Sequence, residues 1–448
     1  MYDVIVLGAG PAGYEVASLL SEGGKRVCVI EKNEEQIGGT CLNEGCIPAK
    51  NFLESALFVK KMAHFNACGV NATLNSFEID KLQESTNSLI LTLRSGIEAK
   101  LKKAGVETKY GVASFESEHK IKVGNEILEA TNIVVATGSK HREFTLLPLA
   151  DNKIISSKEA FLLPKIPASI LIVGAGAIGC EFATFFNSLG SAVELVEYAP
   201  CVLPLEDEDV AKTLMREMQK QKIKVKTSSE VVGATVEANT VKVQIKSKEQ
   251  TSESEYECVL VATGREPNLA DLDGEKIALA FDGRFVATGE YLQSTSHPHI
   301  YAIGDVVNSP ALAHMAYYEA KRVASHILGQ EVMPQKSFVP NVTFCSPQVA
   351  SVGESEKSLK EAGTEYKIIK NFFKSSGKAK IKGDDSGFVK VLVGDGEKIL
   401  GASIIGSDAT ELIHELQIAI STNLTMPSLA KIIFAHPTLS ESIAELTH

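Results

Sequence analysis

Short apolar runs that end at glycine-rich turns recur along this chain. Residues 2–7 (YDVIVL) lead through a glycine turn into GYEVASLL, where apolar residues follow helical spacing, and residues 26–31 (RVCVIE) form a second apolar run. An apolar run bounded by turn residues predicts a buried strand, and the spacing that follows it predicts a helix. The chain therefore begins as strand, turn, helix and strand.

The same arrangement appears a second time. SILIVGAGAIGCEFATFFNSLG begins at Ser169 and AVELVE ends at Glu197, again giving strand, turn, helix and strand. Each copy closes with a related strand and turn, IVVATGS at 133–139 and VLVATGR at 259–265. A repeat of this length predicts two tandem Rossmann-like domains in an α/β fold.

Each copy carries the full fingerprint of a dinucleotide site. The glycines are Gly8, Gly10 and Gly13 in the first copy and Gly174, Gly176 and Gly179 in the second. Each second strand ends in an acid, Glu31 or Glu197, 23 positions after the first glycine of its copy (31 − 8 and 197 − 174). Glycines let the backbone approach a pyrophosphate, and the acid accepts hydrogen bonds from ribose hydroxyls.

The residues around the second acid favour NAD over NADP. Residues 191–211 contain no Lys or Arg but six acids, which are Glu194, Glu197, Glu206, Asp207, Glu208 and Asp209. A 2′-phosphate beside Glu197 would meet a like charge without a compensating cation. The first copy must then hold another dinucleotide. Asp305, in YAIGDVV, can return an acid to that cofactor, although the segment also reads as an ordinary strand and turn.

Composition narrows the class of protein. The 448 residues predict two to four domains, and 44% hydrophobic with 23% charged residues is ordinary for a globular chain. The net charge of −11 argues against nucleic acid or an anionic membrane as the main partner. No run approaches the roughly 18 apolar residues of a membrane span. The start has no secretory signal pattern, so we expect a cytoplasmic protein whose eight cysteines are mostly thiols.

The segment GGTCLNEGCIPAK at 38–50 is the strongest chemical signal. Four residues separate Cys41 from Cys46, and in a regular helix such positions lie about 8–9 Å apart, too far for a disulfide. If these cysteines bridge, the backbone between them departs from helix, which Gly45 and Pro48 permit. A structural disulfide and a zinc half-site are the alternatives. We favour a redox-active pair and expect no metal site, because no further ligands follow at zinc spacing.

Taken in order, these motifs resemble the flavin-dependent disulfide reductases. Within that family the chain is most similar to the members that oxidise dihydrolipoyl groups with NAD. The resemblance runs over essentially the whole chain and rests on GAGPAG, GGTCLNEGCIPAK, VVATGS, GAGAIGCEFA, ATGREPN, AIGD, LAH at 312–314, CSPQVASVG at 345–353 and HPTLSE at 436–441.

The resemblance implies an architecture and two cofactors. It implies an FAD domain with the redox disulfide at 1–145, an NAD domain at 146–264, a central domain completing the FAD site at 265–334 and an α+β dimerisation domain at 335–448. The implied FAD contacts are Gly8, Gly10, Gly13, Glu31, Thr40, Thr137, Gly138, Asp305, Ala313 and His314. The implied NAD contacts are Gly174, Gly176, Gly179, Glu197 and Gly264.

The resemblance also assigns chemical roles. Cys41 exchanges with the substrate dithiol, Cys46 contacts the flavin, and Lys50 pairs with Glu181 near it. On sequence alone, Lys50 is equally well a solvated helix lysine. A dithiol is mostly protonated at neutral pH, so His436, oriented by Glu441, suits the role of general base. Without the motif match, a surface histidine is the ordinary interpretation.

The implied partners are a second copy of the chain and a lipoyl-bearing protein. In the family the histidine comes from the partner subunit, and the lipoyl group belongs to an E2 or H protein, with dihydrolipoamide as the small substrate. The rival functions are another NAD(P)H-dependent flavin disulfide reductase and a non-catalytic flavoprotein subunit. Departures from the family pattern are Glu44 between the cysteines, Met315, Tyr317 and Tyr318 in place of more polar residues, and a short tail after Glu441.

Overall fold

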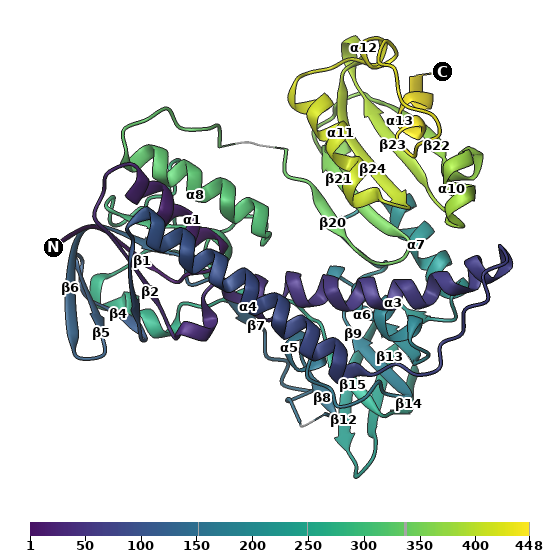
Figure 1. Ribbon diagram of the computed structural model, residues 1–448, viewed down its shortest axis with the longest axis horizontal. Coiled ribbons are helices and arrows are strands. Elements are labelled where there is room, and N and C mark those ends of the chain that lie inside the picture. The colour runs from purple at the N-terminus through teal and green to yellow at the C-terminus, as the bar shows by residue number, and fades with distance from the viewer. Residues whose placement is uncertain (151, 249, 336–337, 448) are drawn as a thin grey trace. The chain divides into compact units, whose positions relative to one another are not determined.

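The computed structural model describes residues 1–150, 152–248, 250–335 and 338–447 (Figure 1). Its contacts group the chain into two compact units. The first contains Met1–Ala49, Lys81–Arg142 and Gly264–Lys336, and the second contains Lys50–Asp80, Glu143–Thr263 and Ser337–His448. These two units do not test the four domain boundaries expected from the sequence, which stay a prediction. One difference is that residues 50–80, expected in the first domain, group with the second unit. Among the described helices, none has the length and apolar character needed to cross a bilayer.

The first unit is built on a seven-stranded mixed sheet. Its strand order is β3-β2-β1-β6-β5-β4, with β19 paired to β6. The strands are β1 (Tyr2–Leu7), β2 (Val27–Glu31), β3 (Glu107–Tyr110), β4 (Ala113–Ser117), β5 (Lys120–Val123), β6 (Glu126–Val135) and β19 (Ile300–Ala302). Strand β1 pairs in parallel with both β2 and β6, and its residues from Val4 to Leu7 are fully buried. Burial on both faces explains its continuous apolar run.

Helices and small ribbons complete the first unit. They are α1 (Pro11–Glu22), α2 (Gly39–Asn43), α4 (Ile79–Ala104), α8 (Ala313–Ile327), β7 (Ser139–His141), β16 (Arg265–Pro267), β17 (Phe281–Asp282) and β18 (Phe285–Val286). Helices α1 and α8 pack side by side (Figure 1). Helix α3 (Cys46–Ala67) begins in this unit and continues into the second. The segment 264–336 thus joins the first sheet through β19, far from it in sequence.

The second unit contains the repeated nucleotide-binding fold. Its parallel sheet has the order β11-β10-β9-β15-β8, beside the antiparallel sheet β12-β13-β14. The elements are β8 (Ile154–Ile155), α5 (Ser157–Ala160), β9 (Ser169–Val173), α6 (Ala177–Ser188), β10 (Ala192–Val196), α7 (Glu208–Lys220), β11 (Lys224–Lys226), β12 (Ser229–Val236), β13 (Val241–Ser247), β14 (Gln250–Tyr256) and β15 (Cys258–Val261). The two predicted Rossmann-like sheets are therefore present.

The C-terminal part of the second unit is an antiparallel sheet covered by helices. Its strand order is β20-β21-β24-β23-β22, and α11 packs on β21 and β24 (Figure 1). The elements are β20 (Asn341–Thr343), β21 (Gln348–Gly353), α9 (Glu356–Glu361), β22 (Lys367–Phe372), α10 (Gly377–Lys382), β23 (Phe388–Val393), β24 (Ile399–Gly406), α11 (Ala409–Ser421), α12 (Met426–Leu429) and α13 (Glu441–Ala444). This is the α+β domain predicted at the C-terminus.

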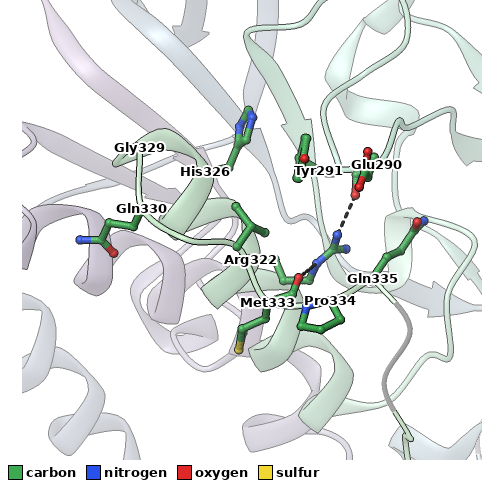
Figure 2. A pocket seen from close by; sticks show the side chains of 10 residues that line it. Glu290, Tyr291, Arg322, His326, Gly329, Gln330, Met333, Pro334 and Gln335 are labelled. Atoms are coloured by element: carbon green, nitrogen blue, oxygen red, sulfur yellow. Dashed lines mark hydrogen bonds between the residues drawn. The ribbon is translucent and has the colours of Figure 1, made fainter.

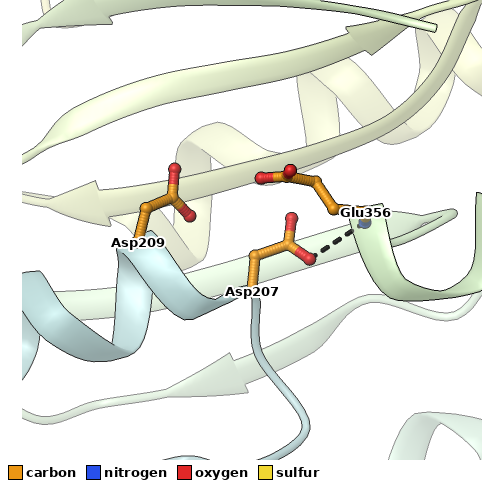
Figure 3. A group of neighbouring side chains, drawn as sticks. All are labelled: Asp207, Asp209 and Glu356. Atoms are coloured by element: carbon orange, nitrogen blue, oxygen red, sulfur yellow. Dashed lines mark hydrogen bonds between the residues drawn. The ribbon is translucent and has the colours of Figure 1, made fainter. Parts of the chain in front are cut away.

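A buried lysine holds this C-terminal sheet to the nucleotide-binding part of the same unit. Lys390 in β23 is fully buried, and its ammonium lies 2.7 Å from Asp207, 2.7 Å from Asp209 and 3.0 Å from Glu356. The three carboxylates converge in Figure 3, and such a group of acids can also bind a divalent cation. Here the ammonium of Lys390 lies among them, and Lys370 and Lys360 also pair with Asp209 and Glu356. Burial alone would lower the pKa of Lys390, but its bonds to Asp207 and Asp209 raise it.

Replacing Lys390 tests how much this cluster stabilises the fold. We expect Lys390→Met to lower the free energy of unfolding by roughly 3–5 kcal/mol, because the three carboxylates would lose the buried cation that they share. The measurement is chemical denaturation monitored by circular dichroism. Lys360→Met is the matched control, since Lys360 pairs with the same Glu356 but is 66% exposed. It should cost about 0–1 kcal/mol. Equal midpoints for Lys390→Met and the unmodified protein would contradict this account.

Candidate active site

The two candidate redox cysteines lie on either side of a helix break. Cys41 is half-buried in α2, and Cys46 is exposed at the first residue of α3. Between them Glu44 has φ −140° and ψ 13°, so the backbone leaves the helix as expected for a pair that can bridge. A side chain on Gly45 would place its Cβ 2.8 Å from the carbonyl oxygen of Thr40. Glycine is therefore needed for α3 to begin so close to α2.

The cysteine turn packs directly on the first glycine-rich loop. The amide of Gly38 donates to the carbonyl oxygen of Ala9 over 2.9 Å. Gly38 and Gly39 have φ values of 90° and 63°, which favour glycine. A Cβ on Gly39 would lie 2.7 Å from the Cα of Gly10. The turn that carries Cys41 is thus fixed against the backbone that the sequence assigns to a cofactor pyrophosphate.

The first glycine-rich loop has the geometry of a dinucleotide cradle. A Cβ on Gly13 would lie 1.9 Å from the carbonyl oxygen of Gly8, so helix and strand meet at a distance only glycine allows. The carboxylate of Glu31 accepts hydrogen bonds from the amides of Ala9 and Lys32, each over 2.7 Å. Burial raises the pKa of Glu31. Those two amide bonds hold the acid at the mouth of the loop, as a ribose-binding residue requires.

Three chain segments meet around Asp305, and Arg265 connects them. The hydroxyl of Ser139 donates to Asp305, while Nε of Arg265 donates to the Ser139 hydroxyl over 2.8 Å. A second guanidinium nitrogen lies 3.4 Å from the hydroxyl of Thr40 beside the cysteines. The pKa of Arg265 is lowered by burial, and Asp305, Glu44 and Cys46 oppose this effect. Its positive charge therefore compensates the unusual carboxylate of Glu44.

The remaining residues assigned to the first site lie on neighbouring turns. Thr137 donates from its hydroxyl to the carbonyl oxygen of Asn268 over 2.7 Å, and the carbonyl oxygen of Gly138 accepts from the Asn268 amide over 2.8 Å. Ala313 and His314 form the first turn of α8. Sequence reasoning did not assign Arg265, although it stands in the quoted ATGREPN motif.

The second glycine-rich loop repeats the first in detail. A Cβ on Gly179 would lie 1.9 Å from the carbonyl oxygen of Gly174, and the space around Gly176 is open to 4 Å. The carboxylate of Glu197 accepts from the amides of Ala175 over 2.6 Å and Ala199 over 2.7 Å. Gly264, after the closing strand, has φ 108°. This loop and acid therefore have the same geometry as the first loop and Glu31.

The structure places one cation near Glu197 that lies outside residues 191–211. Lys226 is aligned with Val196 in the parallel pair of β10 and β11, so its backbone neighbours Glu197. Its ammonium pairs instead with Glu194 over 2.6 Å, and Glu194 is buried. Lys226 is therefore committed to a carboxylate and does not neutralise a 2′-phosphate at Glu197. The preference for NAD remains the better interpretation.

Lys50 and Glu181 form a bidentate ion pair within the second unit. The ammonium of Lys50 lies 3.0 and 2.9 Å from the two carboxylate oxygens, and Glu181 is 7% exposed. Glu181 also accepts from the amide of Phe344 over 3.0 Å, and the ammonium sits 4.6 Å from the centre of the Phe344 ring. Lys50 lies one turn after Cys46 in α3. Its contacts hold the ammonium in place, so Lys50 is not a freely solvated helix lysine.

His436 and Glu441 form an oriented pair near the end of the chain. Nδ1 of His436 lies 2.8 Å from a carboxylate oxygen of Glu441, whose other oxygen accepts from the amide of Thr438 over 2.8 Å. The Thr438 amide and then His436 lower the pKa of Glu441. An ionised carboxylate only accepts, so Nδ1 carries the hydrogen and Nε2 is left as the basic nitrogen. The histidine side chain is 82% exposed.

A separate cavity of about 510 Å³ lies in the first unit at the end of α8 (Figure 2). Arg322 is 2% exposed and donates to the carbonyl oxygens of Met333 over 3.1 Å and Glu290 over 2.7 Å. His326 stacks on Tyr291 with ring centres 4.6 Å apart. These polar groups tie chain segments to one another, and no residue assigned from the sequence lines the cavity. We give it no catalytic role.

Comparisons with known proteins give matches over almost the whole chain. Residues 2–320 match the family described as pyridine nucleotide-disulphide oxidoreductase, and residues 339–447 match its dimerisation domain. Dihydrolipoyl dehydrogenase of Bacillus subtilis is 36% identical over 447 residues, covering 98% of this chain and 96% of that protein. Dihydrolipoyl dehydrogenase 1, mitochondrial, of Arabidopsis thaliana is 34% identical over 454 residues, covering 99% and 89%.

A solved structure agrees with these sequence matches. The HOCl-induced flavoprotein disulfide reductase RclA from Escherichia coli has a TM-score of 0.89 and 26% identity to this chain. The alignment covers 100% of this chain and 99% of that one. The similarity therefore includes both glycine-rich loops, the cysteine turn and the C-terminal sheet.

Glu319, a buried acid beside Asp305, gives a test by pH. It is fully buried and accepts from the amide of Gly304 over 2.6 Å, and burial raises its pKa to about 7. The folded protein therefore binds a proton at Glu319 that the unfolded chain releases above about pH 4.5. The contribution of Glu319 to the free energy of unfolding therefore falls as the pH rises from about 4.5 through 7.

We expect Glu319→Gln to remove the fall in stability that Glu319 causes as the pH rises, because glutamine does not ionise. The melting temperature of the variant relative to the unmodified protein should be higher at about pH 8 than at about pH 5. Glu331→Gln, at an exposed position, is the control, and its melting temperature should differ from that of the unmodified protein by the same amount at both pH values. A Glu319→Gln difference that does not change with pH would show that this acid is not protonated in the folded state.

Proposed function

The chain belongs to the pyridine nucleotide-disulphide oxidoreductase family, and we propose that it is a dihydrolipoyl dehydrogenase that oxidises protein-bound dihydrolipoyl groups with NAD. The resemblance of its motifs to flavin-dependent disulfide reductases is thereby confirmed. One observation carries the proposal within that family. His436 is held by Glu441 with Nε2 available as a base, which a dithiol substrate requires. The two dihydrolipoyl dehydrogenases at 36% and 34% identity support the same substrate class.

The backbone cradles fit two dinucleotides. The family uses FAD and a pyridine nucleotide, and the Gly8–Gly13 loop with Glu31 suits FAD, while the Gly174–Gly179 loop with Glu197 suits NAD. When bound, FAD supplies the two-electron exchange between the cysteine pair and NAD. Its ring would be reached from Cys46, and the Lys50–Glu181 pair would place a cation near the negative charge that develops there.

The dithiol half-reaction follows from the residues at hand. Nε2 of His436 takes the proton of one substrate thiol, and the resulting thiolate attacks the sulfur of Cys41. The disulfide between Cys41 and Cys46 breaks, and Cys46 leaves as a thiolate. The second substrate sulfur, deprotonated in turn, attacks the first substrate sulfur and releases Cys41. Two electrons and two protons have left the substrate, which becomes the lipoyl disulfide.

The second half-reaction restores the cysteine disulfide. NAD takes two electrons and one proton to become NADH, and the other proton goes to water. Because the cysteines hold the electrons between the two halves, the kinetics are ping-pong. Arg265, in electrostatic range of Cys46, favours the thiolate over the thiol.

A homodimer with active sites shared between subunits completes the proposal. The match of residues 339–447 to a dimerisation domain supports a dimer, and the exposed His436 belongs to that domain. Its macromolecular partner is a lipoyl-bearing E2 or H protein. We place the reaction in the cytoplasm, because buried thiols such as Cys28, Cys180 and Cys258 suit a reducing compartment.

The direct test is turnover by the purified, FAD-loaded protein. We expect NADH formation with dihydrolipoamide and little reaction with NADP. Preferential NADPH-dependent reduction of another disulfide would identify a different reductase of the family. Tight FAD binding without any dithiol turnover would identify a non-catalytic flavoprotein subunit.

Replacing His436 isolates the dithiol half-reaction. We expect His436→Gln to lower dihydrolipoamide oxidation by about 10²–10⁴-fold, because the base is lost. NADH oxidation by an artificial one-electron acceptor should persist, since it does not need the substrate thiolate. His414→Gln is the control, since His414 is exposed on α11 and pairs with Gln417. Equal loss of both activities in His436→Gln would point to misfolding instead.

Mass mapping tests the cysteine pair. We expect one equivalent of dithiol to convert a disulfide between Cys41 and Cys46 of the oxidised protein into two thiols that can be alkylated. Differential alkylation before and after reduction, followed by peptide mass spectrometry, measures this change. Exposed Cys68 is the internal control and should be labelled in both states. Full labelling of Cys41 and Cys46 before reduction would remove the basis of the mechanism.

A further inference from the structure

Two tyrosines from distant parts of the chain form a pair in the first unit. Tyr14 lies on α1 and Tyr317 on α8, and their hydroxyl groups share a hydrogen bond. Their ring centres are 6.0 Å apart with an interplanar angle of 63°, an edge-to-face arrangement. Both side chains are half-buried, so each ring keeps part of its surface open. No motif in the sequence pointed to this pair.

The pair stands beside the exchange cysteine. Helix α1 begins at the glycine loop on which the cysteine turn packs, through Gly10 and Gly39. Burial raises the pKa of Tyr14 and of Tyr317, and the charge of Cys41 adds to the shift at both. The sulfur of Cys41 is therefore within electrostatic range of both hydroxyls. Both phenols remain protonated and neutral at physiological pH.

The polar groups around the pair satisfy one another. The two hydroxyls bond together, and the ammonium of Lys100 pairs with Glu15 over 2.5 Å while lying 5.6 Å from the centre of the Tyr14 ring. The charges of Lys100 and Glu15 compensate each other, and the two phenol oxygens are hydrogen-bonded to one another. The open surface that Tyr14 and Tyr317 offer beside Cys41 is consequently mainly aromatic carbon. Such a surface favours a hydrocarbon chain over a charged peptide.

We propose that Tyr14 and Tyr317 form an apolar wall that positions the aliphatic chain of the dithiol substrate for attack on Cys41. This role rests on the proposed function, since the dihydrolipoyl group carries its two thiols at the end of a hydrocarbon chain. The wall selects slender apolar dithiols against charged thiols. Tyr317 is the positioning residue, and its ring is held by edge-to-face packing on the ring of Tyr14.

Steady-state kinetics test the role in turnover. Tyr317→Ala should raise KM for dihydrolipoamide about tenfold, since a few methylene groups lose their apolar contact. Its kcat and its KM for NAD should change by less than about twofold, because the wall only positions the chain. Tyr317→Phe keeps the ring and should restore KM to within about twofold of the unmodified value. Tyr318→Ala is the matched control, because the Tyr318 hydroxyl bonds to Pro334 instead. An unchanged KM in Tyr317→Ala would overturn the proposal.

Alkylation tests the wall without any turnover. In the reduced protein, N-octylmaleimide should label Cys41 about tenfold faster than N-ethylmaleimide, relative to exposed Cys68 as the reference thiol. Mass spectrometry with fragment ions separates Cys41 from Cys46. Tyr317→Ala should lose this chain-length preference and Tyr318→Ala should keep it. The same preference in the unmodified protein and Tyr317→Ala would refute the wall. A protein that retains the preference but turns over no dihydrolipoamide would refute the proposed function alone.

Discussion

The contact between the backbones of Gly10 and Gly39 is the constraint on which the active site depends. A Cβ at Gly39 would fall 2.7 Å from the Cα of Gly10, so no other residue permits this approach. The contact, together with the Gly38–Ala9 hydrogen bond, holds the cysteine turn against the first glycine-rich loop, to which we assign the first dinucleotide. Electron exchange needs short distances, and in the proposed function this backbone packing would set them.

The two nucleotide loops show one geometry adapted to two uses. In both, a Cβ on the third glycine would lie 1.9 Å from a backbone carbonyl oxygen, and the terminal acid accepts a hydrogen bond from an amide of the loop. What differs is the chain that follows each strand. The first acid leads into the cysteine turn, whereas the second leads into a run of acids that opposes a 2′-phosphate. Function diverges in the polar residues while the glycine framework stays the same.

Charges in the interior are compensated by partners from other segments. Buried Lys390 lies among three carboxylates, buried Glu181 pairs with Lys50, and buried Glu194 pairs with Lys226. An unpaired buried charge would cost several kcal/mol, so such pairs fix how their segments meet. Glu319 relieves the same cost differently, since burial raises its pKa to about 7. When it is protonated, Glu319 is neutral and needs no counter-charge beside the Gly304–Asp305 turn.

The sequence by itself determined the features that local geometry dictates. The glycine spacing, the acid after each second strand, the broken helix at Gly45 and the His436–Glu441 pair all follow from short stretches, because a few bonds limit how their residues can lie. Only the tertiary structure decided the partners that lie far apart: Arg265 with Ser139, Lys390 with its three acids, and Tyr14 with Tyr317 across 303 positions. A side chain's identity states what it can bond to. The packing of whole elements determines which partner it meets.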